Sequence, residues 1–349
     1  MNKQVKIETA KRWVLNDVGR ANLVLAEGSV PSPAANEILV KVSAVSLNYR
    51  DNLLVDDGLG FSRPDGQALV PGSDAAGVVV AAGNAVTRFK AGDRVISTFN
   101  PDWIDGPGFG TARTPNGRML GGGLQGVLAQ YIVLDEDWAV SAPESLSDAE
   151  ASTLPCAGLT AWTALAERGN LHAGQTVVVQ GTGGVALFGL QIAVAHGAEV
   201  IVISGDDEKL ARAKALGAVH GINRKKEDWV EAVYRLTGER GADHILEIIG
   251  GAHLGRSLQA AALSGRISLI GVIDGFEISG SFAMLGQKRL VVEGIQVGHR
   301  RGLEDLVRAV DRVGIKPVIE AEYGLAELPA ALDHLARGPF GKVVVRMDG

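Results

Sequence analysis

The first 140 residues alternate short apolar runs with turns rich in Gly, Pro and Asp. The runs read "EILVKVSAV" (37–45), "AAGVVVAAG" (75–83), "DRVIS" (93–97) and "LAQYIVL" (128–134). Short runs with many β-branched side chains, bounded by turn residues, are typical of β-strands. The pattern therefore predicts a small barrel or curled sheet in this part of the chain.

The pattern becomes helical after residue 146. Segment 147–168 has helical spacing, and Ser147 followed three positions later by Glu150 is a capping-box pattern at its start. From 176 to 298, apolar strands alternate with helical runs, which indicates a doubly wound parallel sheet. We therefore expect a domain boundary near Ala142.

The tail of the chain returns to shorter elements. They are expected at 302–313 (helix), 316–323 (strand), 325–337 (helix) and 341–347 (strand). We expect the closing strand to rejoin the first sheet. The sequence thus predicts a discontinuous β-rich domain, residues 1–141 and 300–349, and a nucleotide-binding domain, residues 142–299.

Composition restricts the class of protein. The chain has 349 residues, 46% of them hydrophobic, which is enough for two packed domains, and its net charge of −6 argues against nucleic acid or an anionic membrane as a partner. The single cysteine, Cys156, excludes internal disulfides and a structural zinc site built from several thiolates. No apolar run has the length of a membrane span or a signal-peptide core, so we expect a cytoplasmic protein.

A glycine-rich turn joins the apolar run "TVVVQ" to the next helical run. Gly181, Gly183 and Ala186 have the G-x-G-x-x-[GA] spacing of dinucleotide-binding turns. Small residues at these positions let backbone N–H groups and a helix N-terminus approach a pyrophosphate. We therefore predict cofactor contacts from Gly181, Gly183, Gly184 and Val185.

The residue that ends the second strand of this unit bears on the choice of cofactor. An acid at this spacing binds the ribose hydroxyls of NAD, but this chain has Ser204, which does not repel a 2′-phosphate. Lys209 and Arg224 are candidate cations for that phosphate, although they could equally belong to a solvated surface. Asp206 and Asp207 would oppose it if they pointed inward. The prediction is NADP(H).

Several longer blocks occur in a characteristic order. They are "SLNYRD" (46–51), "PGSDAAGVV" (71–79), "FKAGDRV" (89–95), "LPCAGLTAW" (154–162), "VQGTGGVALFGLQIA" (179–193), "DEKLARAKALGA" (207–218), "SLIGV" (268–272) and "GKVVVR" (341–346). With these blocks the chain resembles the medium-chain dehydrogenase/reductase superfamily, and within it the zinc-free quinone oxidoreductase-like branch. The resemblance implies an α/β protein with a GroES-like β-rich catalytic domain, a Rossmann doubly wound sheet, and an active site in the cleft between them.

The resemblance also bears on a catalytic metal. Family alcohol dehydrogenases hold zinc with a Cys, a His and a second Cys. Here Asn48 and Ser73 stand at the first two positions, and only Cys156 keeps a ligand type. The expected metal content is therefore none, and Cys156 is interpreted as a small buried side chain that lines the cleft.

Without a metal, hydrogen-bond donors must polarise the substrate oxygen. The resemblance implies Asn48 as the nearest donor, with Tyr49 and Thr160 as further catalytic candidates. The cofactor contacts that it implies are Asn48, Thr160, Ile270, Gly271, Val272, Val297, Gly298 and Lys342. Two alternatives stay open, since Thr160 could serve helix packing and Lys342 could be a surface lysine.

Together these features predict a zinc-independent, NADPH-dependent oxidoreductase that transfers hydride to quinones or α,β-unsaturated carbonyls. Two alternatives remain: an alcohol dehydrogenase or aldehyde reductase of the same superfamily, and a nicotinamide-binding structural or regulatory protein with little turnover. The expected partner is a small-molecule electrophile. The apolar strand "LVVEGIQVG" (290–298), at an expected sheet edge, predicts a homodimer.

Overall fold

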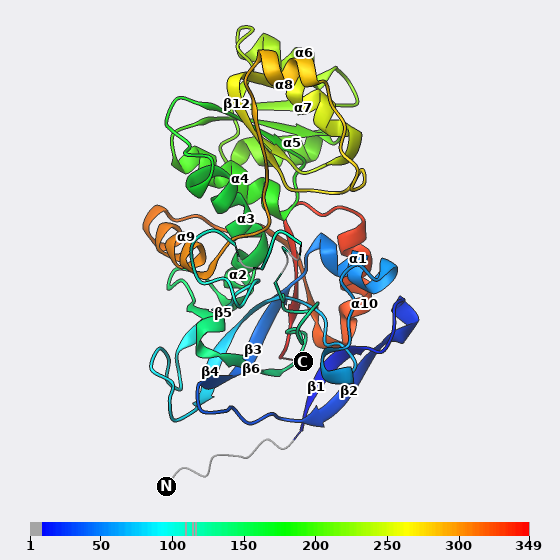
Figure 1. The fold of residues 1–349 in the computed structure, drawn as a ribbon, viewed down its shortest axis with the longest axis vertical. Helices are drawn as coiled ribbons and strands as arrows, with labels where there is room; N and C mark the ends of the chain where they lie inside the picture. Colours follow the sequence, from blue (N-terminus) through cyan, green and yellow to red (C-terminus); the bar gives the residue numbers. More distant parts are fainter. Residues whose placement is uncertain (1–8, 109, 114, 116, 349) are drawn as a thin grey trace. The chain divides into compact units, whose positions relative to one another are not determined.

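The structure is a computed structural model that describes residues 9–108, 110–113, 115 and 117–348. Contacts divide the chain into two compact units, one within Met1–Cys156 and Gly298–Gly349 and the other within Ala157–Val297. The fold class expected from the sequence is confirmed. The first unit is a β-rich GroES-like domain and the second is built on a parallel sheet (Figure 1).

The first unit contains a seven-stranded sheet with the order β14-β15-β3-β4-β5-β7, in which β6 also pairs with β3. Its strands are β3 (Glu37–Ser46), β4 (Asp74–Ala82), β5 (Arg94–Ser97), β6 (Tyr131–Asp135), β7 (Ala139–Ser141), β14 (Ile319–Gly324) and β15 (Lys342–Arg346). A two-stranded ribbon is formed by β1 (Thr9–Leu15) and β2 (Leu23–Ser29). Apolar side chains on every second position of β3 are buried, as a strand with one face on a core requires.

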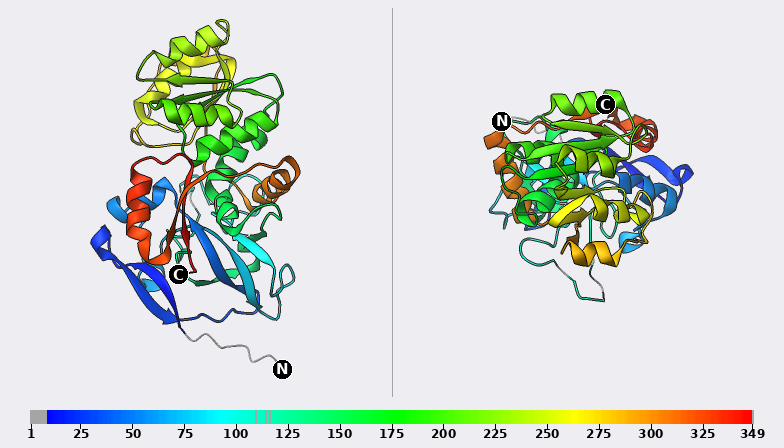
Figure 2. Two further views of the ribbon diagram at one scale, coloured as in Figure 1. Left: turned by 180° about the vertical axis from the view of Figure 1, so that it is seen from behind. Right: turned by 90° about the horizontal axis from the view of Figure 1, so that it is seen from above.

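The helices of this unit are α1 (Tyr49–Asp57), α2 (Asp148–Ala151), α9 (Arg300–Val313) and α10 (Leu328–Ala336). Between and after the last two, the chain supplies β14 and β15. The last strand, β15, pairs antiparallel with β3 and parallel with β14, and Figure 2 shows it in red beside the blue β3. The carboxyl-terminal segment is therefore part of the first unit's sheet.

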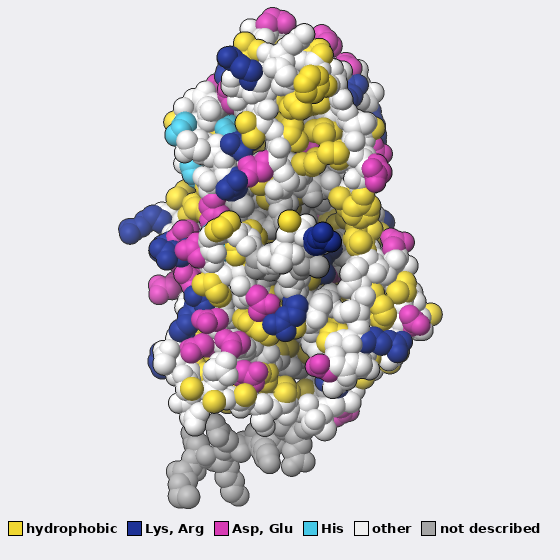
Figure 3. Space-filling view, viewed as in Figure 1, with side chains coloured by type: hydrophobic (Ala, Val, Ile, Leu, Met, Phe, Trp, Pro, Cys, Tyr) yellow, Lys and Arg dark blue, Asp and Glu magenta, His cyan; other side chains and the backbone are white. Residues whose placement is uncertain are grey.

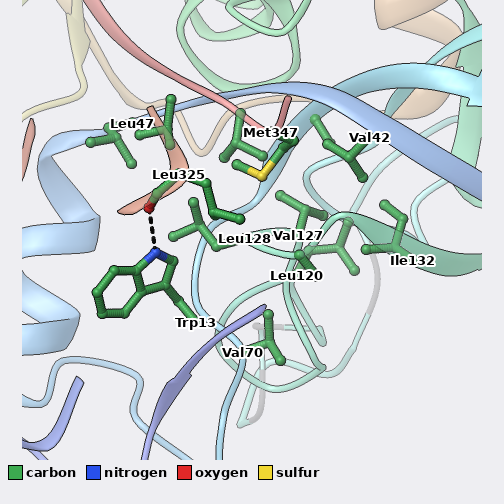
Figure 4. Close-up of a cluster of buried hydrophobic side chains, with 14 of the residues drawn as sticks. Trp13, Val42, Leu47, Val70, Leu120, Val127, Leu128, Ile132, Leu325 and Met347 are labelled. Atoms are coloured by element: carbon green, nitrogen blue, oxygen red, sulfur yellow. Dashed lines mark hydrogen bonds between the residues drawn. The ribbon is translucent and has the colours of Figure 1, made fainter. Parts of the chain in front are cut away.

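The core of the first unit collects apolar side chains from segments far apart in the sequence. Val42, Leu128 and Met347 are buried in one cluster with Trp13 (Figure 4). The indole Nε1 of Trp13 donates to the carbonyl oxygen of Leu325 at 2.7 Å, so the one polar atom of this large side chain is satisfied inside the core. Burial of these residues ties β1 and the tail of the chain to the central sheet.

The boundary between the units lies later in the chain than the sequence pattern indicated. The predicted cap at Ser147 is present, because its Oγ accepts from the N–H of Glu150 and the Glu150 carboxylate accepts from the N–H of Ser147. However, Ala149 of α2 packs against Ala44 and Val344 of the first unit's sheet. Contacts therefore group residues 142–156 with the first unit, whereas the pattern had placed the boundary after residue 141.

The second unit contains a six-stranded parallel sheet with the order β10-β9-β8-β11-β12-β13. Its strands are β8 (Thr176–Gln180), β9 (Glu199–Ser204), β10 (His220–Asn223), β11 (Ala242–Glu247), β12 (Ala261–Leu269) and β13 (Val291–Gly294). Its helices are α3 (Leu159–Trp162), α4 (Gly184–Ala195), α5 (Asp207–Ala215), α6 (Trp229–Leu236), α7 (Leu254–Ala260) and α8 (Phe282–Gln287). In chain order the strands run 3-2-1-4-5-6, so the direction of winding reverses between β8 and β11, where doubly wound sheets bind ligands.

In the part of the chain that the structure describes, every helix is too short or too polar to cross a bilayer.

One buried histidine of the second sheet makes stability depend on pH. His244 of β11 is 5% exposed, and its Nε2 lies 3.2 Å from Oε1 of Gln175. That oxygen can only accept, so Nε2 carries the hydrogen and Nδ1, which has no partner, is unprotonated. Burial lowers the pKa of His244 from 6.5 to about 4.

The unfolded chain protonates His244 at a higher pH than the folded chain does. The stability due to the neutral imidazole is therefore full above pH 6.5 and is lost progressively as the pH falls to about 4. At about 1.4 kcal/mol per pH unit, the loss amounts to about 3 kcal/mol. We predict that His244→Gln, which does not titrate, loses about 3 kcal/mol less than the wild type between pH 7 and pH 4, as measured by urea unfolding. His220→Gln, at a half-buried histidine of β10, serves as the control, and equal pH dependence in wild type and His244→Gln would contradict the prediction.

Candidate functional site

The turn after β8 has the geometry of an anion-binding site. Gly181 has φ +82°, in the left-handed region that favours glycine, and its N–H donates to the carbonyl oxygen of Ile203 at 2.7 Å. Gly183 is the N-cap of α4, and no side chain caps that helix. A Cβ at Gly181 or Gly183 would meet nothing within 4 Å, so the space beside the turn is open. The first amides of α4, which begins with Gly184 and Val185, can therefore receive a phosphate group.

The end of β9 lies next to this turn. Ser204 is 7% exposed, and its Oγ accepts from the N–H of Asp206 at 3.3 Å. The N–H of Arg224 donates to the carbonyl oxygen of Ser204 at 2.9 Å, which places Arg224 directly beside it. The Lys225 side chain crosses Gly205 so closely that a Cβ there would lie 2.9 Å from Lys225 Cε. The Lys225 side chain therefore lies next to the end of β9, and Arg224 is fixed there by its backbone; the sequence interpretation missed Lys225 although it follows Arg224 directly.

The two nearby acids are held by other groups. Asp206 is the N-cap of α5 and accepts from the backbone N–H of Lys209 at 3.1 Å. Asp207 accepts from Asn223 Nδ2 at 2.7 Å and from Lys226 Nζ at 2.6 Å. The carboxylates that could oppose a 2′-phosphate are thus engaged in capping and in pairing.

The predicted segment 270–272 lies beside the end of β11. The N–H groups of Ile270 and Gly271 both donate to the carbonyl oxygen of Glu247, at 2.9 and 3.1 Å. A Cβ at Gly271 would lie 1.5 Å from the carbonyl oxygen of Ile248, so only glycine allows this close approach. The segment from Ile270 to Val272 therefore follows the end of β12 beside the end of β11, and its contact with the nicotinamide stays a prediction.

Sequence reasoning missed a buried carboxylate at this position. Glu247 is fully buried and accepts from the N–H groups of Ile249 and Gly250 at 3.0 Å, from Gln180 Nε2 at 3.1 Å, and from Ser257. His253 Nδ1 lies 3.1 Å from it. Burial raises the pKa of Glu247, but hydrogen bonds from His253 and Ser257 outweigh burial and the pKa is lowered. Glu247 therefore stays ionised and orders the turn after β11; the only sequence signal was a lone acid that ends an apolar strand.

The remaining residues that the sequence placed in this domain are Thr160, Val297 and Gly298. Thr160 is buried in α3, between two π-helical segments, Leu154–Gly158 and Thr163–Glu167. Such segments occur frequently at functional sites. Val297 is buried with φ +51°, a strained value for a β-branched residue, and Gly298 begins the carboxyl-terminal part of the first unit.

In the first unit, the structure brings together two of the predicted residues, Asn48 and Lys342. Lys342, the first residue of β15, is 4% exposed, which rules out its interpretation as a surface lysine. Its Nζ donates to Asn48 Oδ1 and to the carbonyl oxygen of Leu47, both at 2.6 Å. Asn48 is 7% exposed and is the N-cap of α1, whereas Tyr49, the first residue of that helix, is 45% exposed. Among the hydrogen bonds of the described residues, none holds the Tyr49 side chain in the way that Lys342 holds Asn48.

Polar groups continue from Asn48 into the interior of the first unit. Asn48 Nδ2 lies 3.5 Å from Ser73 Oγ, and Ser73 Oγ donates to Asp74 Oδ1 at 2.5 Å. The other oxygen of Asp74 accepts from the backbone N–H of Cys156 at 3.0 Å. Burial raises the pKa of Asp74 and of Cys156 and lowers that of Lys342, while attraction between Asp74 and Lys342 opposes the shifts of both.

Arg50 and Asp51, which follow Asn48 in α1, form contacts that hold this helix in place. Asp51 Oδ2 accepts from the N–H of Asn48 at 2.8 Å, which holds the start of α1. Arg50 lies 3.8 Å from Asp51 Oδ1, packs over the ring of Phe99 at 5.1 Å, and donates to the carbonyl oxygen of Gly121 at 3.3 Å. These contacts fix the segment that carries Asn48.

The donors around Asn48 do not fit a zinc ion. An amide, a hydroxyl and a lysine occupy the space, and the described residues contain no group of three or more His, Cys, Asp or Glu that could hold a metal. Burial raises the pKa of Cys156, so its thiol resists conversion to the thiolate that zinc requires. The Lys342 ammonium adds positive charge where a metal would need negative ligands.

Two family models match the chain. Residues 34–144 match the one described as an alcohol dehydrogenase GroES-like domain, and residues 184–312 match the one described as a zinc-binding dehydrogenase. A zinc-type alcohol dehydrogenase-like protein of Schizosaccharomyces pombe is 36% identical over 350 residues, covering 97% of this chain and 100% of that protein. A quinone oxidoreductase of Rattus norvegicus is 26% identical, covering 90% of this chain and 91% of that protein.

Solved structures agree with these matches. A candidate alcohol dehydrogenase from Sinorhizobium meliloti 1021 has 61% sequence identity and a TM-score of 0.94, covering 97% of this chain and 99% of that chain.

Proposed function

Because the chain belongs to the medium-chain dehydrogenase/reductase superfamily, we propose that it is a zinc-independent, NADPH-dependent reductase of quinones or α,β-unsaturated carbonyls. The superfamily makes it an oxidoreductase that uses a nicotinamide cofactor, NAD or NADP. The observation that carries the finer proposal is the set of groups around Asn48, which offers hydrogen-bond donors and a buried cation but no metal-ligand set.

The reaction follows from the chemistry of those groups. The bound nicotinamide supplies or accepts a hydride. The protein must stabilise negative charge that develops on the substrate oxygen, and Asn48 Nδ2 is a donor suited to that task. Conjugation in a quinone or an enone spreads this charge, so hydrogen bonds suffice. A simple alcohol requires the stronger stabilisation that a metal ordinarily supplies.

An alcohol dehydrogenase or aldehyde reductase is the second candidate. Two of the similar proteins carry alcohol dehydrogenase names, and both are more similar in sequence to this chain than the rat quinone oxidoreductase is. Product analysis separates the candidates, because an enone reductase reduces the C=C bond and an aldehyde reductase yields an alcohol.

The groups at the end of β9 support NADP(H) as the cofactor. Ser204 carries no charge that would repel a 2′-phosphate, the Lys225 side chain lies over the adjacent Gly205, and the Arg224 N–H is bonded to the Ser204 carbonyl oxygen. A phosphate with about −1.5 to −2 charges favours such a position. The exposed guanidinium and ammonium groups lose little hydration when they bind it.

The cofactor proposal predicts the effect of a carboxylate at position 204. Ser204→Asp should weaken NADPH binding by about tenfold or more, about 1.4 kcal/mol, and should spare or improve NADH binding. Ser204→Ala, which changes no charge, is the matched control. Both dissociation constants are measured by fluorescence titration of the reduced cofactors. Tighter binding of NADH than of NADPH by the wild type would show the proposal to be wrong.

The reaction proposal predicts the effect of removing the Asn48 amide. If Nδ2 stabilises the substrate oxygen as an oxyanion-hole donor does, Asn48→Ala should lower kcat by about 10²–10³-fold, with little change in the Kd of NADPH. Wild-type turnover should be faster with benzoquinones or enones than with saturated aldehydes. Steady-state NADPH oxidation across these substrates measures both. Efficient oxidation of simple alcohols without turnover of quinones or enones would contradict the proposal.

We also propose a homodimer formed through the second unit. Strand β13 lies at the edge of the described sheet, and its Val291 is 42% exposed. The preceding segment exposes Phe276 (64%) and Phe282 (83%), and Figure 3 shows hydrophobic side chains gathered on the face that Figure 1 labels α7 and α8. Pairing two β13 edges across a two-fold axis would satisfy the free backbone groups and cover this apolar surface.

The dimer proposal predicts that charge on this surface prevents association. Phe276→Glu combined with Phe282→Glu should convert a dimer into a monomer at micromolar concentration, because two carboxylates per subunit would be buried unpaired. Light scattering coupled to size exclusion measures the mass. Val219→Glu, at an exposed apolar residue next to the opposite edge strand β10, should remain dimeric. A monomeric wild type would refute the proposal.

A further inference from the structure

A buried lysine controls the orientation of the Asn48 side chain. An ammonium group has hydrogens to donate and no lone pair to accept, so the atom of Asn48 that lies 2.6 Å from Lys342 Nζ must be the amide oxygen. The amide nitrogen then occupies the other branch of the side chain. The oxygen and the nitrogen of the amide are nearly equal in shape, so the Lys342 ammonium decides which of them faces it.

The other end of the hydrogen-bonded chain sets the same direction. Both oxygens of Asp74 accept, one from Ser73 Oγ at 2.5 Å and the other from the N–H of Cys156 at 3.0 Å. Since the Ser73 hydroxyl hydrogen is directed to Asp74, Ser73 Oγ accepts from Asn48 Nδ2 at 3.5 Å. Donors and acceptors therefore run in one direction, from Lys342 through Asn48 and Ser73 to Asp74.

This arrangement fixes the donor group of Asn48. The Asn48 nitrogen has two hydrogens: Ser73 Oγ lies 3.5 Å away, at the limit of a hydrogen bond, and the Asn48 side chain also hydrogen-bonds to the Asp74 carboxylate. The backbone of Asn48 is also fixed, because its N–H donates to Asp51 Oδ2 at 2.8 Å. Nδ2 is therefore a donor whose position is held from both the backbone and the side chain.

The charges of the cluster are balanced in pairs. Asp51 has Arg50 at 3.8 Å, and Asp74, which is 0% exposed, is attracted by the buried Lys342 ammonium. A buried carboxylate requires such a cation because neither water nor distant charges compensate it. Within this cluster, the Lys342 ammonium supplies the positive charge that compensates the Asp74 carboxylate.

We propose that Lys342 is a positioning residue that takes the place of a metal cation in this site: its ammonium fixes Asn48 so that Nδ2 is the donor to the substrate oxygen. This differs from the cofactor contact that the sequence resemblance implied for Lys342. The inference rests on the proposed function for its catalytic consequence. Its structural part, that the ammonium occupies the place of a cation, is independent of turnover.

The catalytic part is tested with Lys342→Met, Asn48→Ala and the two combined. Lys342→Met should lower kcat for a benzoquinone by about tenfold or more, with the Kd of NADPH from fluorescence titration within about threefold of wild type. Because Lys342 acts through Asn48, the combined variant should be no slower than Asn48→Ala alone. Lys90→Met, at an exposed lysine of the first unit, is the control. Losses that multiply, or a weakened Kd with unchanged kcat, would overturn the proposal.

The structural part is tested with Co²⁺ and requires no activity. Asn48→Cys with Ser73→His adds two metal-ligand types next to Cys156 and Asp74, and this pair of changes is made with and without Lys342→Met. Without the lysine, the protein should bind one Co²⁺ per chain with the visible absorption of a tetrahedral site; with the lysine it should bind about tenfold or more weakly. Equal binding in both proteins, or binding in neither, would overturn the proposal. If the wild type reduces no quinone or enone, the proposed function fails while the Co²⁺ result still decides this inference.

Discussion

The pairing of β15 with β3 is the constraint on which the first unit's site depends. Val344, Val345 and Arg346 lie opposite Ser46, Val45 and Ala44, and the N–H of Leu47 donates to the carbonyl oxygen of Val343 at 2.9 Å. This register places Lys342 next to Asn48, 294 residues earlier in the chain. A one-residue slip would turn the Lys342 side chain to the opposite face of the sheet. The buried valines of β15 therefore do more than fill a core: they set the position of a charge.

In the second unit, the strand ends are positioned by close contacts between backbone segments. At the strand ends, Gly271 lies against Ile248 with no room for a side chain. The Glu247 carboxylate accepts hydrogen bonds from the N–H groups of the turn that follows it. Gly181 and Gly183 leave open space beside the first turn of α4. Side chains are absent where a cofactor phosphate would lie, and a buried carboxylate orders the loop nearby. The strand ends of this unit are thus shaped largely by main-chain groups, whose positions tolerate changes in neighbouring side chains.

This difference between the units explains which features could be predicted from the sequence and which could not. The turn from Gly181 to Val185 and the serine at the end of β9 are local patterns, so spacing and the flanking strand and helix were enough to predict them. The superfamily, the two-part α/β fold and a nicotinamide-dependent oxidoreductase were confirmed. The contact between Lys342 and Asn48 joins two ends of the chain, and no local pattern could reveal it. The role of residues 142–156 was obscured for a similar reason, because Ala149 packs on Ala44 and Val344 through tertiary contact alone.

The buried cluster also links stability to function in a way that the cofactor region does not. Burial lowers the pKa of Lys342 and raises that of Asp74, so each charge is costly alone and persists because the other is present. The same ammonium that compensates Asp74 orients the Asn48 amide, so a change at Lys342 affects both the folded state and the hydrogen-bond donor. By contrast, Arg224 and Lys225 are exposed, and a change there alters affinity for a phosphate at little cost to folding. Under the proposed function, cofactor preference can therefore change readily on this fold, whereas Asn48, the proposed donor to the substrate oxygen, is constrained by the packing of the sheet around it.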